Sequence, residues 1–286
     1  MTCIEKIYSV SALVGTGRCN ANCSFCAGKP LRVVGDEAAY ERSLEAAIKL
    51  SARHGGWSLS LTGAGEPTCE PEAVTRALEI YKKCADQGAW MPNGILFTNG
   101  ILFGDPEFCD KWLSLWKSLG LTNVAVSVHS TSESHQGTVY GVGYPAFPTI
   151  FENIKRNGVG VRATLLLSDK YVFDADSYSW HVNMLISMGV RNITSWPVGN
   201  PDGTRNEYTI SRMGLFGIRR WLNKNTKVCH GHAWGGGVFD YEGSILRLTS
   251  YVTKHDPKKD YVRQLVVFKD GTVAYSLVKE GALCLK

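Results

Sequence analysis

The feature that most limits the possible folds is a regular alternation of short apolar segments with longer amphipathic ones. The apolar segments have the length and composition of buried strands, and a segment with helical spacing follows each of them. The six expected strands are residues 7–15, 57–63, 94–100, 123–130, 160–168 and 192–198. Strands that alternate with helices in this way form a parallel sheet with helices outside it, either open or closed into a barrel. We therefore expect an α/β fold, in which ligands bind at the C-terminal ends of the strands.

The pattern changes after about residue 225. Residues 244–252 and 263–278 alternate apolar and polar positions as antiparallel strands do, and Asp270-Gly271 is typical of a hairpin turn. We interpret residues 1–224 as the main α/β unit. Residues 225–286 are then a C-terminal antiparallel β extension that covers the mouth or the side of this unit. A content of 44% hydrophobic residues is enough for a buried core.

The expected compartment follows from what the sequence lacks. It has no run of about 18 apolar residues, and its first ten residues lack the basic and apolar pattern of a secretory signal. We therefore expect a cytoplasmic protein with no membrane partner. Cytoplasmic thiols stay reduced, so clustered cysteines among the nine indicate metal binding or catalysis rather than disulfides.

The charge of the chain is uneven. Residues 211–286 hold 13 Lys and Arg against 6 Asp and Glu, while the net charge of the whole chain is only +5. A basic C-terminal portion favours nucleic acid or a phosphorylated substrate as a partner. The alternative is a solvated surface that keeps the protein soluble.

Three cysteines lie within eight residues, at Cys19, Cys23 and Cys26. Three thiolates can bind three irons of a four-iron cluster and leave the fourth iron open, whereas structural metal sites are closed. The spacing differs from the paired C-x2-C arms of zinc ribbons and from the C-x2-C-x2-C of ferredoxins. The alternatives are a zinc site or three ordinary thiols. Cys69, Cys84 and Cys109 are scattered on or beside the expected helices, and we expect them to be ordinary buried thiols.

The motif C-x3-C-x-aromatic-C after a first strand, followed by α/β repeats to about residue 222, resembles the radical S-adenosylmethionine (SAM) superfamily. The resemblance implies a partial (β/α)6 barrel in which Cys19, Cys23 and Cys26 bind a [4Fe-4S] cluster. The open iron would chelate SAM, and an electron would split SAM into methionine and a 5′-deoxyadenosyl radical that abstracts hydrogen from a substrate. Phe25 would pack near the adenine. A reductant such as flavodoxin or ferredoxin would supply the electron.

The second expected strand ends in a turn, TGAGEPT, that fits this resemblance. It is similar to the Gly-Gly-Glu-Pro motif that binds the amino group of SAM in the family, with Ala64 in place of the first glycine. Gly63 and Gly65 let the backbone approach a ligand closely. Glu66, followed by Pro67, can accept a hydrogen bond from an ammonium group.

Further candidate residues lie on or at the ends of the later strands. The resemblance implies that Asn99 and Ser127 contact the ribose or carboxylate of SAM and that Val198 contacts the adenine. His129 is a candidate catalytic residue that faces the substrate, or a hydrogen-bonded structural residue. Arg162 lies within an apolar run and needs an anion when buried, either the SAM carboxylate or an internal Glu or Asp.

The C-terminal portion has its own cluster of Cys229, His230 and His232, with Cys284 further on. It predicts an auxiliary metal, a loop that contacts the substrate, or ordinary packing. Trp234 and the three glycines 235–237 could close over a ligand. We favour an enzyme that modifies a nucleotide, RNA or another anionic molecule. The alternatives are an activase that generates a glycyl radical on a partner enzyme, and a non-catalytic iron–sulfur protein for electron transfer or sensing.

Overall fold

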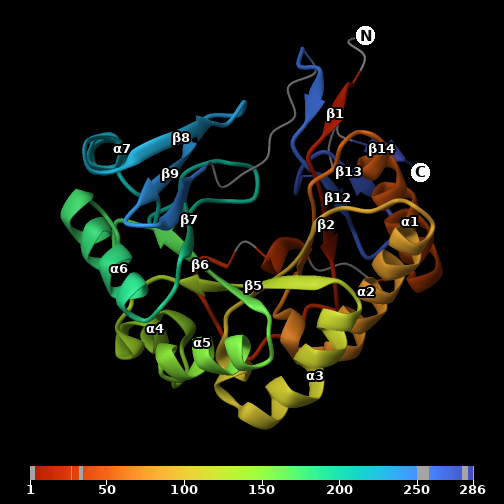
Figure 1. Cartoon of the computed structure of the whole chain (residues 1–286), viewed down its shortest axis with the longest axis horizontal. Helices are drawn as coiled ribbons and strands as arrows, with labels where there is room; N and C mark the ends of the chain where they lie inside the picture. The colour runs from red at the N-terminus through yellow and green to blue at the C-terminus, as the bar shows by residue number, and fades with distance from the viewer. Residues whose placement is uncertain (1–3, 27, 32–34, 250–257, 279–282, 286) are drawn as a thin grey trace.

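The centre of the fold consists of six consecutive strand–helix units, as the sequence alternation predicts (Figure 1). The structure, a computed structural model, describes residues 4–26, 28–31, 35–249, 258–278 and 283–285. The six strands are β2 (Ser9–Leu13), β3 (Ser58–Thr62), β4 (Asn93–Thr98), β5 (Leu121–Val128), β6 (Gly160–Leu167) and β7 (Asn192–Pro197). The helices that follow them are α1 (Glu37–Arg53), α2 (Pro71–Asp86), α3 (Pro106–Ser118), α5 (Phe147–Arg156), α6 (Ala175–Ser187) and α7 (Arg212–Asn225).

The six strands are parallel and lie side by side in chain order. One further parallel strand extends the sheet at each end, β12 (Leu265–Val267) beside β2 and β10 (Ser244–Leu248) beside β7. Antiparallel strands form the outer edges, namely β13 (Val273–Ala274), β14 (Leu283–Leu285), β9 (Gly237–Tyr241) and β8 (Lys227–Gly231). In the described residues the order of strands runs from β14 to β8 without closing, so the barrel is partial, as expected.

The C-terminal strands pair with one another in antiparallel fashion, as expected, and two of them also join the central sheet. Each of β10 and β12 pairs in parallel with one strand of the main unit, and the two lie at opposite edges of the sheet. Alternating polarity identifies a strand with one exposed face, but it carries no information on the direction of the neighbouring strand. The hairpin at Asp270-Gly271 does join β12 to β13 in antiparallel fashion. The expected strand beyond Thr249 lies outside the described residues.

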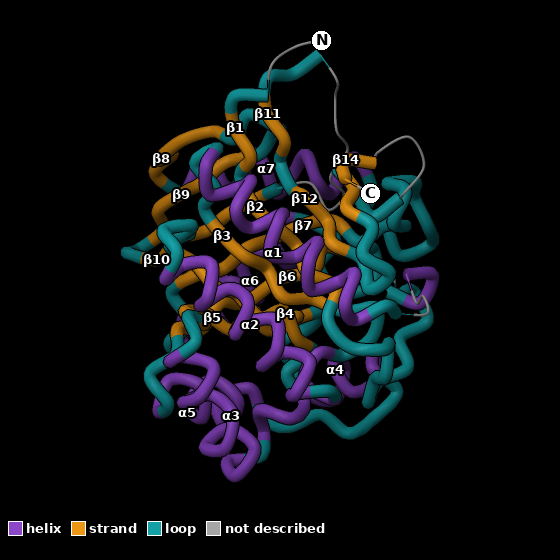
Figure 2. The backbone as a smooth tube through the Cα atoms, turned by 90° about the vertical axis from the view of Figure 1, so that its right-hand side faces the viewer, coloured by secondary structure: helices purple, strands orange, loops and turns teal. Residues whose placement is uncertain are grey.

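The two faces of the curved sheet differ in polarity. Apolar side chains at alternate positions, such as Val124, Val126 and Val128 of β5, belong to the core beneath the outer helices. Figure 2 shows α1 and α2 across the outside of the first strands. Side chains of the opposite parity, among them Ser9, Ser11 and Ser60, point to the concave side. The concave side of the barrel therefore carries hydroxyl groups beside apolar side chains such as Phe97 and Trp196, which suits a ligand with polar and apolar parts.

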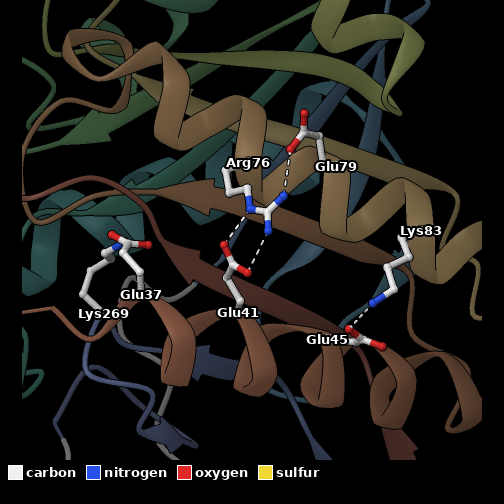
Figure 3. Close-up of polar contacts among 7 residues, drawn as sticks. All are labelled: Glu37, Glu41, Glu45, Arg76, Glu79, Lys83 and Lys269. Carbon is white, nitrogen blue, oxygen red and sulfur yellow. Dashed lines mark hydrogen bonds and ion pairs between the residues drawn. The ribbon is translucent and has the colours of Figure 1, made fainter.

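Ion pairs join the outer elements to one another (Figure 3). Lys83 of α2 binds Glu45 of α1 at 2.8 Å, and Arg76 of α2 binds Glu41 of α1 through two nitrogens. Lys269, in the turn after β12, lies 2.6 Å from Glu37 at the start of α1. Because exposed pairs contribute only about 0–1 kcal/mol each, the apolar core accounts for most of the stability of this layer.

A helix that the sequence pattern did not predict, α4 (Glu133–Tyr140), lies in the long polar loop after β5. It depends on Gln136, whose buried side chain accepts hydrogen bonds from the backbone N–H groups of His129 and Ser130. The same amide donates to the carbonyl of Ser127 at 2.8 Å. The helix therefore fixes the C-terminal end of β5, where the sequence predicts site residues.

The turn between β8 and β9 reaches the opposite edge of the sheet. The ring of Trp234 packs edge-on against Tyr8, with ring centres 4.9 Å apart, and the hydroxyl of Tyr261 donates to the carbonyl of Ala233. Tyr8 follows the short strand β1 (Lys6–Ile7), which pairs with β11 (Tyr261–Val262). The chain therefore bridges the open side of the barrel here. In the part of the chain that the structure describes, no helix is long and apolar enough to cross a membrane.

Candidate active site

A pocket lies at the C-terminal ends of the six central strands, where the fold class predicts a ligand. Most of the residues predicted from the sequence line it together, although they come from distant parts of the chain. They are Cys19, Cys23, Phe25, Cys26, Gly65, Glu66, Pro67, Asn99, Ser127, His129 and Val198. The strand ends and the cysteine loop therefore form one site.

The cysteine loop is held against the strand ends by two direct contacts. The N–H of Glu66 donates to the carbonyl of Arg18 at 2.8 Å, and the side-chain amide of Asn99 donates to Asn20 Oδ1 at 2.7 Å. Gly65 lies so close to the loop that an added Cβ would be 2.1 Å from the carbonyl oxygen of Arg18. The loop and the turn after β3 are thus one packed unit.

Glu66 is buried at the base of the pocket. Its Oε1 accepts hydrogen bonds from the N–H and hydroxyl of Thr68 and from the hydroxyl of Thr98, while Oε2 accepts from the N–H of Asn99. Burial raises the pKa of Glu66, and these hydrogen bonds act in the opposite direction. Oε2 has the greater remaining capacity to accept, so it is the atom best able to bind an ammonium group.

Aromatic rings form one wall of the pocket. Phe25 packs against His129 and Tyr208, with ring centres 5.0 and 4.6 Å apart, and His129 also meets Tyr140 edge-on. Burial lowers the pKa of His129 to about 3, so its imidazole is neutral at physiological pH. His129 therefore offers the pocket a neutral hydrogen-bonding group rather than a charge.

The three thiols fit a cluster better than a single metal ion. Burial, followed by the nearby Cys26 and Cys19, raises the pKa of the Cys23 thiol to about 12, so the three sulfurs lie within electrostatic range of one another. Yet no group of three His, Cys, Asp or Glu side chains in the described residues is arranged to hold one ion. Thiolates bound to different irons of a cluster stand further apart than ligands of one ion. The arrangement is thus consistent with a [4Fe-4S] cluster.

A fourth thiol, Cys69, lies nearer the site than the sequence predicts. We expected it to be an ordinary buried thiol, but it is half-buried, and burial together with Glu66 and Cys19 raises its pKa to about 11. The other two cysteines expected to be buried, Cys84 and Cys109, are buried under the helices. Cys69 does not line the pocket.

Two predicted site residues do not line this pocket. Gly63 lines a neighbouring one, and Arg162 lies on β6 four residues before Leu166, which does line the site. At about 3.3 Å per residue, Arg162 is about 13 Å further down the strand. Its assignment to the SAM carboxylate stays a prediction. At the C-terminal end, Cys229 and His230 are exposed on β8, His232 stacks on Trp234, and the side chain of Cys284 lies outside the description.

Sequence reasoning missed several lining residues: Ala21, Gly28, Thr62, Phe97, Thr98, Tyr140, Leu166, Trp196 and Gly199. Two of these had a usable signal, because side chains two residues apart on a strand share a face. Trp196 has the parity of Val198, and Phe97 that of Asn99, and their rings stack with centres 5.9 Å apart. Tyr140 gave no such signal, since it comes from the unexpected helix α4.

The close approach of Gly65 gives a first prediction. Gly65→Ala would push the new methyl group into the Arg18 carbonyl, so we expect the cysteine loop to shift and the iron content after anaerobic reconstitution to fall severalfold. Such overpacking costs about 1–3 kcal/mol. Gly63→Ala is the control, because its Cβ would be 3.2 Å from the nearest atoms and should fit with small shifts. Equal iron and sulfide contents in both variants would contradict the prediction.

The fold and site define a class of protein: a partial α/β barrel with an open three-cysteine site beside a buried glutamate. The sequence model of the radical SAM superfamily matches residues 13–169, which is more than half of the chain. The chain therefore belongs to the radical SAM superfamily and is a radical SAM enzyme. Its cofactors are a [4Fe-4S] cluster and SAM. The sequence has no match among curated proteins.

Solved structures of the family share the fold. The structure of anSMEcpe with bound SAM and the Cp18Cys peptide has a TM-score of 0.61 at 15% identity, covering 94% of this chain and 73% of its own. SuiB of Streptococcus suis bound to SAM has a TM-score of 0.63 at 12% identity, covering 98% and 62%. A radical SAM methyltransferase from Sphaerobacter thermophilus has a TM-score of 0.54 at 15% identity, covering 88% and 66%. At these identities the likeness concerns the fold alone.

Proposed function

We propose that this enzyme abstracts hydrogen from a small anionic substrate that binds inside the barrel, next to SAM. The observation that carries the proposal is a second pocket on the concave face of the sheet. It shares Gly28, Thr62, Phe97 and Trp196 with the cysteine pocket, so the two are adjacent. A molecule in the second pocket would lie beside one in the first.

The second pocket combines apolar walls with polar groups that can bind an anion. Its walls include hydroxyl groups of Ser9, Ser11 and Ser60 and the side chain of Arg263, which also lies 5.2 Å from the ring centre of Trp234. Burial lowers the pKa of Arg263 to about 10, so it still carries its charge at neutral pH. Phe97 and Trp196, which stack between the two pockets, offer an apolar surface. An anionic molecule with a hydrogen-bonding body fits these walls.

The residues of the first pocket have separate tasks in this proposal. Cys19, Cys23 and Cys26 hold the cluster, and Glu66 binds the ammonium group of SAM. Phe25 and Val198 offer apolar surface to the adenine. When bound, the cluster and SAM supply a one-electron cleavage that yields a 5′-deoxyadenosyl radical, with flavodoxin or ferredoxin as a suitable reductant.

Other residues of the first pocket keep water and reactive hydroxyl groups away from the bound SAM. Ser127 lines the pocket, and its carbonyl is occupied by Gln136 and by the hydroxyl of Tyr140 at 3.1 Å. The Tyr140 hydroxyl is therefore directed at the Ser127 carbonyl rather than at SAM or the substrate. The neutral ring of His129 lies between Phe25 and Tyr140 and helps to exclude water from the SAM side. Such exclusion protects a radical from side reactions.

The experiment measures substrate-stimulated formation of 5′-deoxyadenosine under anaerobic conditions at two salt concentrations. Candidate compounds are phosphorylated nucleosides, small carboxylates, RNA and peptides. We expect stimulation by small anionic compounds that weakens as salt rises, because charge-driven binding is screened. RNA would show a still steeper salt dependence, since each neutralised phosphate releases counterions. Stimulation only by a peptide or a partner protein, insensitive to salt, would contradict the proposal and favour the activase alternative.

A further inference from the structure

Four polar side chains gather on the concave face below the SAM pocket: Arg162 and Thr164 of β6, Thr194 of β7 and Arg247 of β10. Thr164 pairs with Thr194, and Thr194 pairs with Arg247, so these three lie in one row across adjacent strands. Paired residues of parallel strands point to the same side of a sheet. Leu166 and Trp196, two residues further along β6 and β7, line the SAM pocket. The row therefore lies about 7 Å below that pocket.

Several polar atoms of this cluster lack an internal partner. Arg162 Nε, Thr164 Oγ1 and Thr194 Oγ1 are buried without a hydrogen bond to any described residue. None of the ion pairs in the described part of the chain involves Arg162 or Arg247. Buried polar groups are nearly always hydrogen-bonded, and unpaired buried charges are costly. Adjacent unpaired groups that can all donate hydrogen bonds indicate a ligand that carries hydrogen-bond acceptors.

The two arginines lie on β6 and β10, the strands on either side of β7, within electrostatic range of each other. Burial, and next the charge of Arg247, lowers the pKa of Arg162 to about 10, and burial lowers the pKa of Arg247. Arg162 keeps its proton at neutral pH, so it repels its charged neighbour. Arg247 Nη1 donates to Asn192 Oδ1 of β7, which fixes the direction of its guanidinium. Both arginines are partly exposed, so neither is sealed within the core.

We infer that Arg162, Arg247, Thr164 and Thr194 form an oxyanion site that binds the carboxylate or phosphate group of the substrate. This inference rests on the proposed function and extends it, because it assigns the anionic end of the substrate to a named place. Guanidinium groups donate in pairs to planar or tetrahedral oxyanions, and the two hydroxyls add donors from the neighbouring strands. A group bound this far below the strand ends belongs to a small molecule that can enter the barrel.

The test is thermal unfolding of the reconstituted holoenzyme in phosphate, acetate or chloride at matched ionic strength. We expect phosphate or acetate to raise the Tm of the wild type by about 3–6 °C over chloride when the anion is at about ten times its Kd. Whichever of the two acts at lower concentration identifies the preferred group. Arg162→Met should lose this shift and should have a Tm in chloride at or above that of the wild type. Thr194→Val should retain part of the shift.

Arg219→Met, at an exposed position of α7, is the matched control and should keep the full shift. SAM affinity in Arg162→Met should stay within about twofold of the wild type. An equal anion shift in Arg162→Met and the wild type would overturn the inference. So would a tenfold loss of SAM affinity, which would assign Arg162 to the SAM carboxylate instead. If no anionic compound stimulates 5′-deoxyadenosine formation while the Arg162-dependent shift persists, the oxyanion site stands and the proposed function falls.

Discussion

Replacing Cys23 with alanine is expected to leave the reconstituted protein without a [4Fe-4S] cluster and to reduce SAM cleavage to background. With Cys23 gone, two thiolates remain for three irons, and the SAM-binding iron is lost with the cluster. The effect should be total because Cys23 lies between the other two cysteines in the loop, and burial followed by Cys26 and Cys19 raises its pKa, so no other side chain can replace its thiolate. Iron and sulfide analysis, visible absorbance and 5′-deoxyadenosine assays measure the loss.

Two matched controls separate ligation from general damage by cysteine removal. Cys69→Ala removes a thiol that lies within electrostatic range of Cys19. Cys84→Ala removes a buried thiol of α2. Both should keep the cluster, although Cys84→Ala leaves a small cavity. Loss of iron in Cys69→Ala would show a fourth protein ligand and a closed site. Stoichiometric zinc without iron in the wild type would contradict the cluster assignment itself.

The six strand–helix units were predictable because their signal is local. Each helix repeats apolar residues with a period near 3.6, and each strand is a short apolar run, so neither depends on distant residues. The helix α4 lacks this signal, because its stability comes from Gln136, which bonds to the backbone of β5. Strand direction is equally non-local. The parallel pairing of β10 with β7 is set by the path of the chain through β8 and β9.

The site residues also fall into those that a local sequence motif identifies and those that only the fold brings together. The cysteine loop and the turn with Glu66 were identifiable because each is a short contiguous motif, and the fold then brings their residues to one pocket. Arg162 shows the limit of motif reasoning. An arginine in an apolar run predicts an anion nearby, but only the fold shows that it lies below the SAM pocket and within electrostatic range of Arg247. Tyr140 and Tyr208 meet His129 and Phe25 only in the folded chain.

Glu66→Gln is expected to weaken SAM binding by about 10- to 100-fold. Loss of a hydrogen bond to a charged group costs about 1.5–3 kcal/mol, and each 1.4 kcal/mol is about a factor of ten in Kd. A glutamine amide cannot accept all four of the hydrogen bonds that the carboxylate accepts, because all four groups that contact Glu66 are donors and the amide has only one acceptor oxygen. Depending on how the amide is oriented, either the N–H of Asn99, or the N–H of Thr68 with the hydroxyls of Thr68 and Thr98, would then face the NH2 of the glutamine. Isothermal titration of the anaerobic holoenzyme with SAM gives the Kd.

Since Glu66 also fixes the turn after β3, its contact with SAM must be separated from its structural role. Thr98→Val provides this separation, because it removes one donor to Glu66 Oε1 and leaves the charge and Oε2 in place. If Oε2 binds the ammonium group, Thr98→Val should change the SAM affinity by only about twofold. The substitution also removes the hydrogen bond from the N–H of Gly100, so it deletes two buried hydrogen bonds that each stabilise the fold by about 1 kcal/mol. Equal losses of SAM affinity in the two variants would mean that Glu66 acts through the shape of the turn. A loss confined to Glu66→Gln, with the cluster intact in both proteins, places the negative charge of Glu66 against the ammonium group of SAM.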